Sequence, residues 1–175
     1  RSHVGFAPPQ RRRSYKFKRT ISCELLGSYL SRAISIEGLL NGRGDFNDNI
    51  RMLHSVGAKY IGRSICLWGG EAKLLANFDR IKRQLPMVHA VDPEMVLEAC
   101  IFEIVTRDIE QVPVPDWAFE ALGLPVEKRN FRYEAILYPP KQRKRSWGRD
   151  GGVPDVSQTE TQLWFYFLAV SYIQL

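Results

Sequence analysis

The sequence predicts an α/β fold of the parallel (β/α) barrel type. Strand-like and helix-like segments alternate along residues 31–86, which implies parallel strands covered by helices. No glycine-rich phosphate loop follows the first strand, as an open nucleotide-binding sheet would require. Polar side chains recur near the carboxyl ends of successive strands, where barrels collect their functional groups. We expect the chain to hold only about three or four β/α units of such a barrel.

The first strand is predicted at residues 31–38. Ile34 and Ile36 fall on the same face of it, and it ends at Glu37 and Gly38. An apolar residue at every second position is typical of a strand. The acidic residue that closes it is therefore expected at the carboxyl edge of the sheet.

The segment that follows predicts a helix over residues 46–56. Asp45 is suited to cap its amino end, and Gly57 stands where a helix commonly terminates. Three apolar residues recur at helical spacing, namely Phe46, Ile50 and Leu53. Together with the first strand, this helix forms one β/α unit.

A second unit is predicted directly after it. Residues 58–70 are expected to form a strand that ends in paired glycines. The next helix is indicated by apolar residues at helical spacing: Leu74, Phe78, Ile81 and Leu85. Pro86 is expected to end that helix, because proline inside a helix removes a hydrogen bond.

The third strand is harder to assign. Residues 97–105 are apolar and rich in β-formers, which favours a strand. Asp92 followed by proline is also a good start for a helix, so a helix from Asp92 remains the alternative.

The rest of the chain predicts two helices around a long basic connector. A short helix is expected at 115–124, the connector at 125–157, and a terminal helix from Ser157. The apolar run of that helix is shorter than the roughly 20 residues that a membrane span needs. A helix buried against a sheet is therefore preferred to a truncated membrane span. We expect the natural chain to continue beyond Leu175.

Positive charge is concentrated in two short segments. Residues 1–20 carry seven Lys or Arg and residues 141–149 carry five, out of 25 in the chain. We interpret residues 1–30 as a basic amino-terminal arm and 31–175 as the amino-terminal part of the barrel. Basic segments interleaved with aromatic residues also occur in nucleic-acid-binding proteins. A nucleic-acid-binding or assembly protein that acts through these two segments is therefore the alternative function.

Neither the cysteines nor the histidines predict a metal site or a cofactor. Cys23, Cys66 and Cys100 are widely spaced and contain no CxxC pair, so buried free thiols are favoured over a disulfide. Free thiols slightly favour a cytoplasmic location. His54 and His89 have no metal-ligand spacing.

Two stretches carry a resemblance to a known group. "ACIFEIVTRDIEQVPVPDWAFEALGLPVEKRNF" and "GGVPDVSQTETQLWFYFLAVSYIQL" resemble the amino-terminal part of a glycoside-hydrolase-like (β/α) barrel protein of a poorly characterised bacterial group. The resemblance covers about residues 31–175 and implies a carbohydrate-active barrel. Many retaining enzymes of this type carry the acid/base on the fourth strand and the nucleophile on the seventh. Glu103 lies on the third predicted strand here, and the sequence ends before any later strands. An incomplete barrel of this kind is not expected to turn over substrate.

Glu103 is the first candidate catalytic residue. It lies between Phe102 and Ile104, and partial burial favours the protonated form that a general acid needs. Glycoside hydrolysis uses two carboxyl groups, one of which acts as that acid. The alternative is a structural ion pair between Glu103 and an arginine such as Arg63 or Arg32.

Glu37 is the candidate second carboxylate, at the end of the first strand. Arg63 and Trp68 are candidate substrate-binding residues near the end of the second strand, and an indole ring suits stacking on a sugar. Trp117 and Tyr138 belong to the connectors and are candidates to wall the cleft, although packing is favoured for each. The predicted activity is that of a glycoside hydrolase, if the chain is active.

The expected partners follow from this interpretation. A carbohydrate is the predicted ligand, and nucleic acid is the alternative. A sheet with few strands leaves an unpaired edge, through which we expect the chain to self-associate. No membrane span is predicted.

The basic arm generates the first testable prediction. Deleting residues 1–20 is expected to leave the melting temperature nearly unchanged, because few apolar side chains anchor this segment. Thermal unfolding of the full and shortened chains measures the difference. A drop of several degrees would show that the segment is part of the fold.

Overall fold

The computed structural model describes residues 20–102, 104–140, 146–147 and 151–175. The chain divides into two compact units. The first unit comprises Arg1–Cys66 and Arg80–Cys100, and the second comprises Leu67–Asp79 and Ile101–Leu175. Each unit is described separately below.

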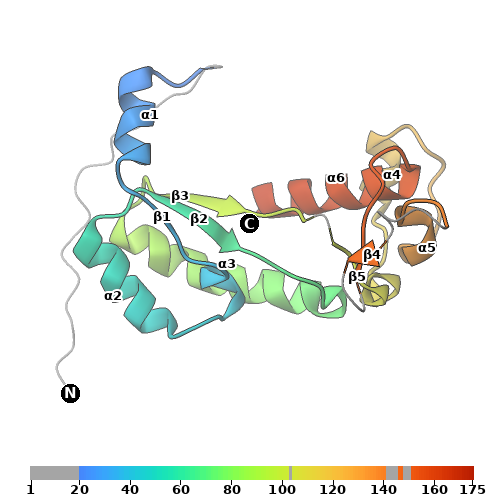
Figure 1. Ribbon diagram of the computed structural model, residues 1–175, viewed down its shortest axis with the longest axis horizontal. Coiled ribbons are helices and arrows are strands. Elements are labelled where there is room, and N and C mark those ends of the chain that lie inside the picture. Colours follow the sequence, from blue (N-terminus) through green and yellow to red (C-terminus); the bar gives the residue numbers. More distant parts are fainter. Residues whose placement is uncertain (1–19, 103, 141–145, 148–150) are drawn as a thin grey trace. The chain divides into compact units, whose positions relative to one another are not determined.

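The first unit is built on a parallel sheet of three strands. The strands are β1 (Ala33–Ser35), β2 (Tyr60–Ile65) and β3 (Val96–Ala99), in the order β1-β2-β3 (Figure 1). Both pairings are parallel, with β2 in the middle. The prediction of a mixed α/β fold with parallel strands is confirmed. Across the described residues the strands do not close into a barrel.

Two helices cover one side of this sheet. They are α2 (Phe46–Val56) and α3 (Leu74–Val91), and both lie on the same side of the strands in Figure 1. Right-handed crossovers between strands in sequential order require this arrangement. The buried side chains between helices and strands include Ile50, Leu53, Ile61, Ile81 and Val88.

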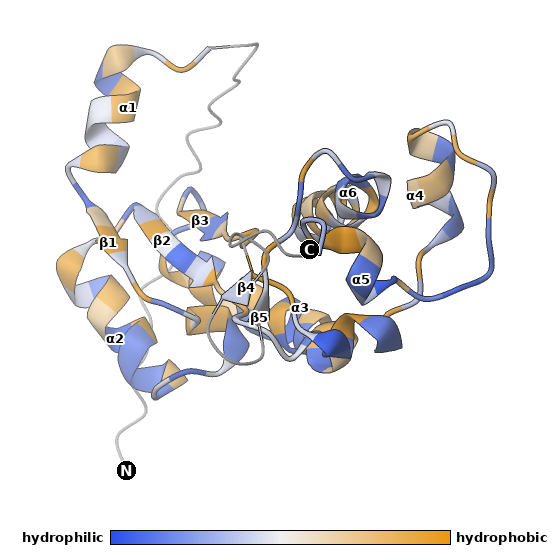
Figure 2. Ribbon diagram, turned by 45° about the vertical axis from the view of Figure 1, so that its right-hand side comes forward, coloured by the Kyte–Doolittle hydropathy of each residue, from blue (hydrophilic) through white to orange (hydrophobic). Residues whose placement is uncertain are grey.

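Helix α2 forms as the sequence predicts. The Asp45 side chain accepts a hydrogen bond from the backbone N–H of Asp48 at 3.0 Å, which caps the amino end. Gly57 ends the helix with φ +61°, a left-handed conformation that favours glycine. Figure 2 shows both hydrophobic and hydrophilic residues along α2, as expected of a helix with one buried face.

Helix α3 does not end at Pro86, so that prediction was wrong. The helix continues through Pro86 to Val91. Pro86 lies on the exposed side of the helix. Val88, two residues after it, and Ile81, before it, are both fully buried. Burial of apolar side chains on both sides of the proline offsets the hydrogen bond that the proline removes.

Strand β3 is shorter than the predicted strand at 97–105. It ends at Ala99, and Val105 instead forms an isolated antiparallel bridge with Gly152. The prediction of a strand that continues to residue 105 is therefore wrong. The alternative helix does not form either, because Asp92 begins a turn in which its side chain accepts from the Glu94 N–H at 2.9 Å.

An additional helix, α1 (Cys23–Leu30), lies inside the segment that we interpreted as a basic arm. Ser22 caps its amino end by accepting from the Leu25 N–H at 3.2 Å. The Tyr29 hydroxyl donates to the carbonyl oxygen of Glu94 at 2.9 Å, just before β3. This bond ties α1 to the amino end of the sheet.

The second unit contains the remaining elements. They are α4 (Asp116–Ala121), α5 (Tyr133–Ile136), β4 (Ser146–Trp147), β5 (Gly151–Gly152) and α6 (Thr159–Ile173). Short 3₁₀ helices occur at Leu39–Asn41 in the first unit and at Glu71–Lys73 and Arg107–Gln111 in the second. The predicted helices near 115–124 and after Ser157 are confirmed. The segment 125–157 is more than a connector, since it contributes α5 and the β4–β5 pair.

Aromatic packing around α6 forms the core of the second unit. The ring of Phe131 lies 5.1 Å from that of Trp164 and 5.7 Å from that of Phe167. Leu163 and Leu168 of α6 are also buried. In the described parts of the chain, every helix is too short or too polar to cross a membrane.

Pro86 provides a test of the helix that runs through it. Replacing Pro86 with Ala is expected to raise the free energy of unfolding by about 1–3 kcal/mol, because the exposed site regains a backbone hydrogen bond. Denaturant unfolding measures this change. The matched control is Met87→Ala at the neighbouring exposed position, for which we expect a change within about 0.5 kcal/mol. Destabilisation by Pro86→Ala would show that the helix does not run through residue 86.

Candidate functional site

A bulge in β2 creates the most unusual backbone in the sheet. Ile61 pairs with Leu97 and Ile65 pairs with Ala99, so β2 advances four residues while β3 advances two. Arg63 lies inside this bulge with φ +58°, a left-handed conformation that is rare for any residue with a side chain. Such strain is concentrated at functional sites in proteins.

The bulge brings a carboxylate of β3 onto the backbone of β2. The Arg63 N–H donates to Glu98 Oε2 at 2.9 Å, and the Ser64 hydroxyl donates to the Glu98 carbonyl oxygen at 2.7 Å. A Cβ atom on Gly62 would lie 3.2 Å from Glu98 Oε2. Glycine at position 62 therefore leaves room for the carboxylate. The negative charge of Glu98 also acts on Tyr60, which lies on the same strand.

The side chain of Arg63 reaches a second carboxylate. Its Nη2 lies 3.3 Å from Glu37 Oε2, and Arg43 forms a further ion pair with Glu37. The side chains of Arg63 and Glu37 are 39% and 34% exposed, so the ion pair is open to solvent and to a ligand. We call Glu37, Arg43, Tyr60, Arg63 and Glu98 the Arg63 cluster.

Two groups of the Arg63 cluster have shifted pKa values. Burial raises the pKa of Tyr60, and the negative charge of Glu98 raises it further. A hydrogen bond to the Cys66 thiol raises the pKa of Arg63, and Glu37 adds to the shift. Tyr60 therefore stays a neutral hydrogen-bond donor and Arg63 stays a cation at physiological pH.

The structure brings two of the predicted site residues into contact. Glu37 and Arg63 are in contact. Glu103 lies outside the described residues, so its predicted role as an acid stays a prediction. The sequence analysis did not select Glu98. Like Glu103, it is an acidic residue in a segment rich in β-formers, and this pattern could have identified it.

The predicted aromatic residues lie in the second unit. The ring of Trp68 packs 4.6 Å from that of Phe102, yet Trp68 remains 42% exposed. Trp117 packs against two rings of α6, Tyr166 and Phe167, each at 6.0 Å. The Tyr138 backbone N–H donates to Val153 at 3.4 Å, next to the β4–β5 pair. Packing thus accounts for Trp117, whereas Trp68 presents a partly open aromatic surface.

The remaining predictions concern the two basic segments, the cysteines and a metal site. Residues 1–19, 141–145 and 148–150 lie outside the described residues, so the alternative function of the two basic segments stays a prediction. Cys66 is buried and Cys100 half-buried, but Cys23 is exposed, contrary to the prediction of three buried thiols. Within the described ranges, His, Cys, Asp and Glu side chains nowhere gather in threes as metal ligands.

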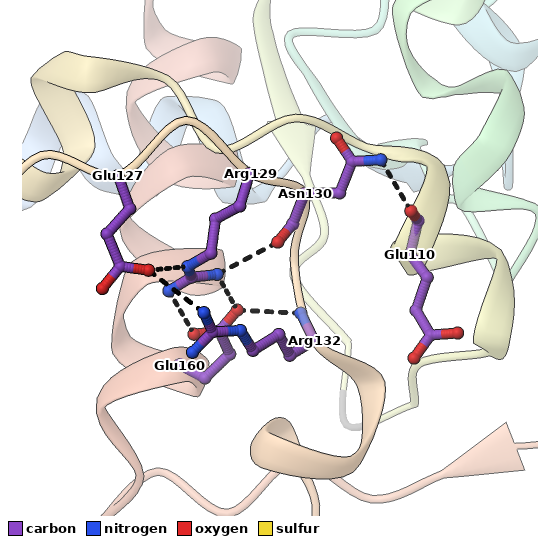
Figure 3. A network of polar contacts seen from close by, with 6 residues as sticks. All are labelled: Glu110, Glu127, Arg129, Asn130, Arg132 and Glu160. Carbon is purple, nitrogen blue, oxygen red and sulfur yellow. Dashed lines mark hydrogen bonds and ion pairs between the residues drawn. The ribbon is translucent and has the colours of Figure 1, made fainter.

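A second polar network lies in the second unit (Figure 3). Arg129 binds both oxygens of Glu160 in a bidentate ion pair, at 2.7 and 2.8 Å. The backbone N–H of Arg132 donates to the same carboxylate at 2.8 Å, and Glu127 binds Arg129 from the other side at 2.6 Å. Glu160 is buried at the start of α6.

This network is structural rather than catalytic in character. Both carboxylate oxygens of Glu160 are occupied, and the guanidinium of Arg129 is also stacked 5.1 Å from the Phe119 ring centre. Fixed partners on every side leave little capacity for a ligand. The network instead joins the chain around residues 127–132 to the first turn of α6.

Comparisons with known proteins add no relative. Protein-family models, curated proteins and solved structures all give no significant match to this chain. A functional proposal therefore has to rest on the residues of the chain itself.

The buried ion pair allows a direct test. Replacing Glu160 with Ala is expected to lower the free energy of unfolding by about 3–5 kcal/mol, because it leaves the guanidinium of Arg129 buried without its main partner. Denaturant unfolding monitored by tryptophan fluorescence measures the loss. Glu127→Ala is the matched control, since Glu127 binds the same arginine but is 48% exposed, and about 0–1 kcal/mol is expected. Equal losses for both variants would contradict the assignment of Glu160 as the anchor.

Proposed function

We propose that the first unit belongs to a carbohydrate-active (β/α) barrel of the glycoside hydrolase type, with its sugar site at the Arg63 cluster. One observation carries the proposal: a single strained arginine contacts two carboxylates. The side chain of Arg63 contacts Glu37 in the turn after β1, and its backbone N–H donates to Glu98 of β3. Glu37 supplies one of the two carboxyl groups that glycosidic cleavage requires, and Glu98 holds the backbone of the arginine that contacts it. Their place near the carboxyl ends of parallel strands is also where barrels bind substrates.

The two faces of the sheet support a barrel over an open sheet. One face packs against α2 and α3, while Ala33, Ser35 and Val96 on the other face are exposed in the described structure. An open parallel sheet needs helices on both faces, and both faces are then strongly apolar. A face with Ser35, Tyr60 and Glu98 suits the polar interior of a ligand-binding barrel better.

Each residue of the Arg63 cluster has a different role in the proposed site. Glu37 lies between two guanidinium groups, so it accepts hydrogen bonds and suits the role of base or nucleophile. Arg63 positions Glu37, and Glu98 in turn holds the backbone of Arg63. The complementary acid is assigned to Glu103 on the sequence argument of its apolar neighbours.

Within the second unit, Trp68 is the aromatic residue best suited to stacking on a sugar. Its indole is partly exposed and is supported by Phe102. Aromatic faces bind the C–H edges of sugar rings and cost little side-chain entropy when they are already packed. Trp117 is left with a packing role.

Ligand binding tests the proposal without requiring turnover. Titration calorimetry with neutral oligosaccharides is expected to show binding that Glu37→Gln weakens about tenfold or more, because a charged hydrogen-bond acceptor is lost. The matched control is Glu120→Gln on the exposed surface of α4, which should bind like the wild type. Unchanged affinity in Glu37→Gln would remove Glu37 from the site.

The salt dependence of binding separates the proposal from nucleic-acid binding. Sugar affinity is expected to change little with ionic strength, whereas binding to phosphates weakens by orders of magnitude between about 50 and 200 mM salt. Oligonucleotide binding with a steep salt dependence, and no sugar binding, would favour the basic segments instead. Hydrolysis that survives Glu103→Gln in the longest natural form of the protein would exclude Glu103 as the acid.

A further inference from the structure

Two cysteines lie opposite each other where β2 and β3 end. The last pair in the parallel ladder is Ile65 with Ala99, and the Cys100 N–H donates to the Ile65 carbonyl oxygen at 2.9 Å. Cys66 and Cys100 are the next residue on each strand. The sequence alone gave no reason to pair them, since 33 residues separate the two positions.

The backbone around the two thiols suits a covalent link. Adjacent strands lie about 4.8 Å apart, within the Cα–Cα range of about 4.4–6.8 Å that a disulfide spans. The Cys66 N–H donates to the side chain of Asn41 at 2.6 Å, which fixes the backbone on that side. A disulfide between Cys66 and Cys100 therefore needs side-chain rotation but little movement of the strands.

The surroundings of the thiols determine how they react. Cys66 is 2% exposed and contacts the guanidinium of Arg63 at 3.9 Å, whereas Cys100 is half-buried and accessible to a small reagent. Burial raises the pKa of Cys100 to about 11, with Cys66 and Glu98 adding to the shift and Arg63 opposing it. Cys100 is therefore a protonated thiol at neutral pH, and its reactive thiolate increases as the pH rises.

We propose that Cys66 and Cys100 form a dithiol site that a small-molecule disulfide, such as oxidised glutathione, converts into an intramolecular disulfide between β2 and β3. The inference is independent of the proposed sugar site. It also goes beyond free thiols at these positions, because it assigns the two cysteines a common reaction.

The reaction balances in two exchange steps. The Cys100 thiolate attacks one sulfur of oxidised glutathione, so that a mixed disulfide forms and one glutathione thiolate leaves. The Cys66 thiol then loses its proton and attacks the Cys100 sulfur, which releases the second glutathione. The protein loses two electrons and two protons, and one glutathione disulfide is reduced to two thiols.

Peptide mapping of the full chain tests the proposal. After incubation with oxidised glutathione at mildly alkaline pH and blocking of free thiols, digestion without reductant is expected to yield a peptide that links Cys66 to Cys100. Cys23→Ser is the matched control and should keep the link, whereas Cys100→Ser should lose it. The link should raise the melting temperature by on the order of 10 °C, and a thiol reductant should reverse the rise.

A second probe requires both thiols but no oxidant. A trivalent phenylarsenical bridges two neighbouring thiols, and we expect the folded chain to hold one equivalent against an excess of a monothiol. Cys100→Ser should release it, and Cys23→Ser should retain it. Cys100 is the preferred variant, because it is less buried than Cys66 and its loss disturbs the fold less.

Two results would overturn the inference. One is a mixed disulfide that stays on Cys100 while Cys66 remains free, together with monothiol-labile arsenical binding. The other is a folded chain whose thiols all remain unmodified by both reagents yet are blocked quantitatively in denaturant. A crosslink through Cys23 would likewise contradict the pairing of Cys66 with Cys100.

Discussion

Strand β2 is the element on which the first unit depends, because among the described strands of this unit it is the one hydrogen-bonded on both sides. It fixes β1 and β3 in parallel, so their carboxyl ends meet at one edge and their crossover helices lie on one side. Its residues Ile61 and Ile65 are buried in the core of the unit. A defect in this central strand therefore affects the sheet and the polar edge at the same time.

The backbone strain of the bulge in β2 is offset by the interactions that Arg63 makes with neighbouring residues. A non-glycine residue in the left-handed region costs on the order of 1–2 kcal/mol. Arg63 gains in exchange a backbone hydrogen bond to Glu98, an ion pair with Glu37 and a contact with the Cys66 thiol. The same displacement of the strand creates both the cluster of carboxylates and the position of Cys66 opposite Cys100. One local irregularity thus accounts for the two chemically distinctive features of the unit.

How far the sequence predicts this structure depends on how local the determining contacts are. Helix α2 was predictable because Asp45, its apolar stripe and Gly57 all act within one segment. The path of α3 through Pro86 and the end of β3 at Ala99 were not, since burial of Val88 and the bridge from Val105 to Gly152 involve the tertiary fold. The site shows the same division. Glu37 and Arg63 could be picked out singly, but the role of Glu98 follows from a register shift that no local pattern encodes.

The second unit shows why the long segment 125–157 is ordered over its described parts. A connector of this length would be expected to be irregular unless something held it. Arg129 fixes the segment by binding the buried carboxylate of Glu160. Two residues later, Phe131 packs in the aromatic core beside Trp164. An ion pair of this kind adds little net stability over an apolar pair, but it tolerates few alternative arrangements. The aromatic contact therefore supplies most of the stabilisation, and the ion pair fixes the register in which residues 129–132 meet the first turn of α6.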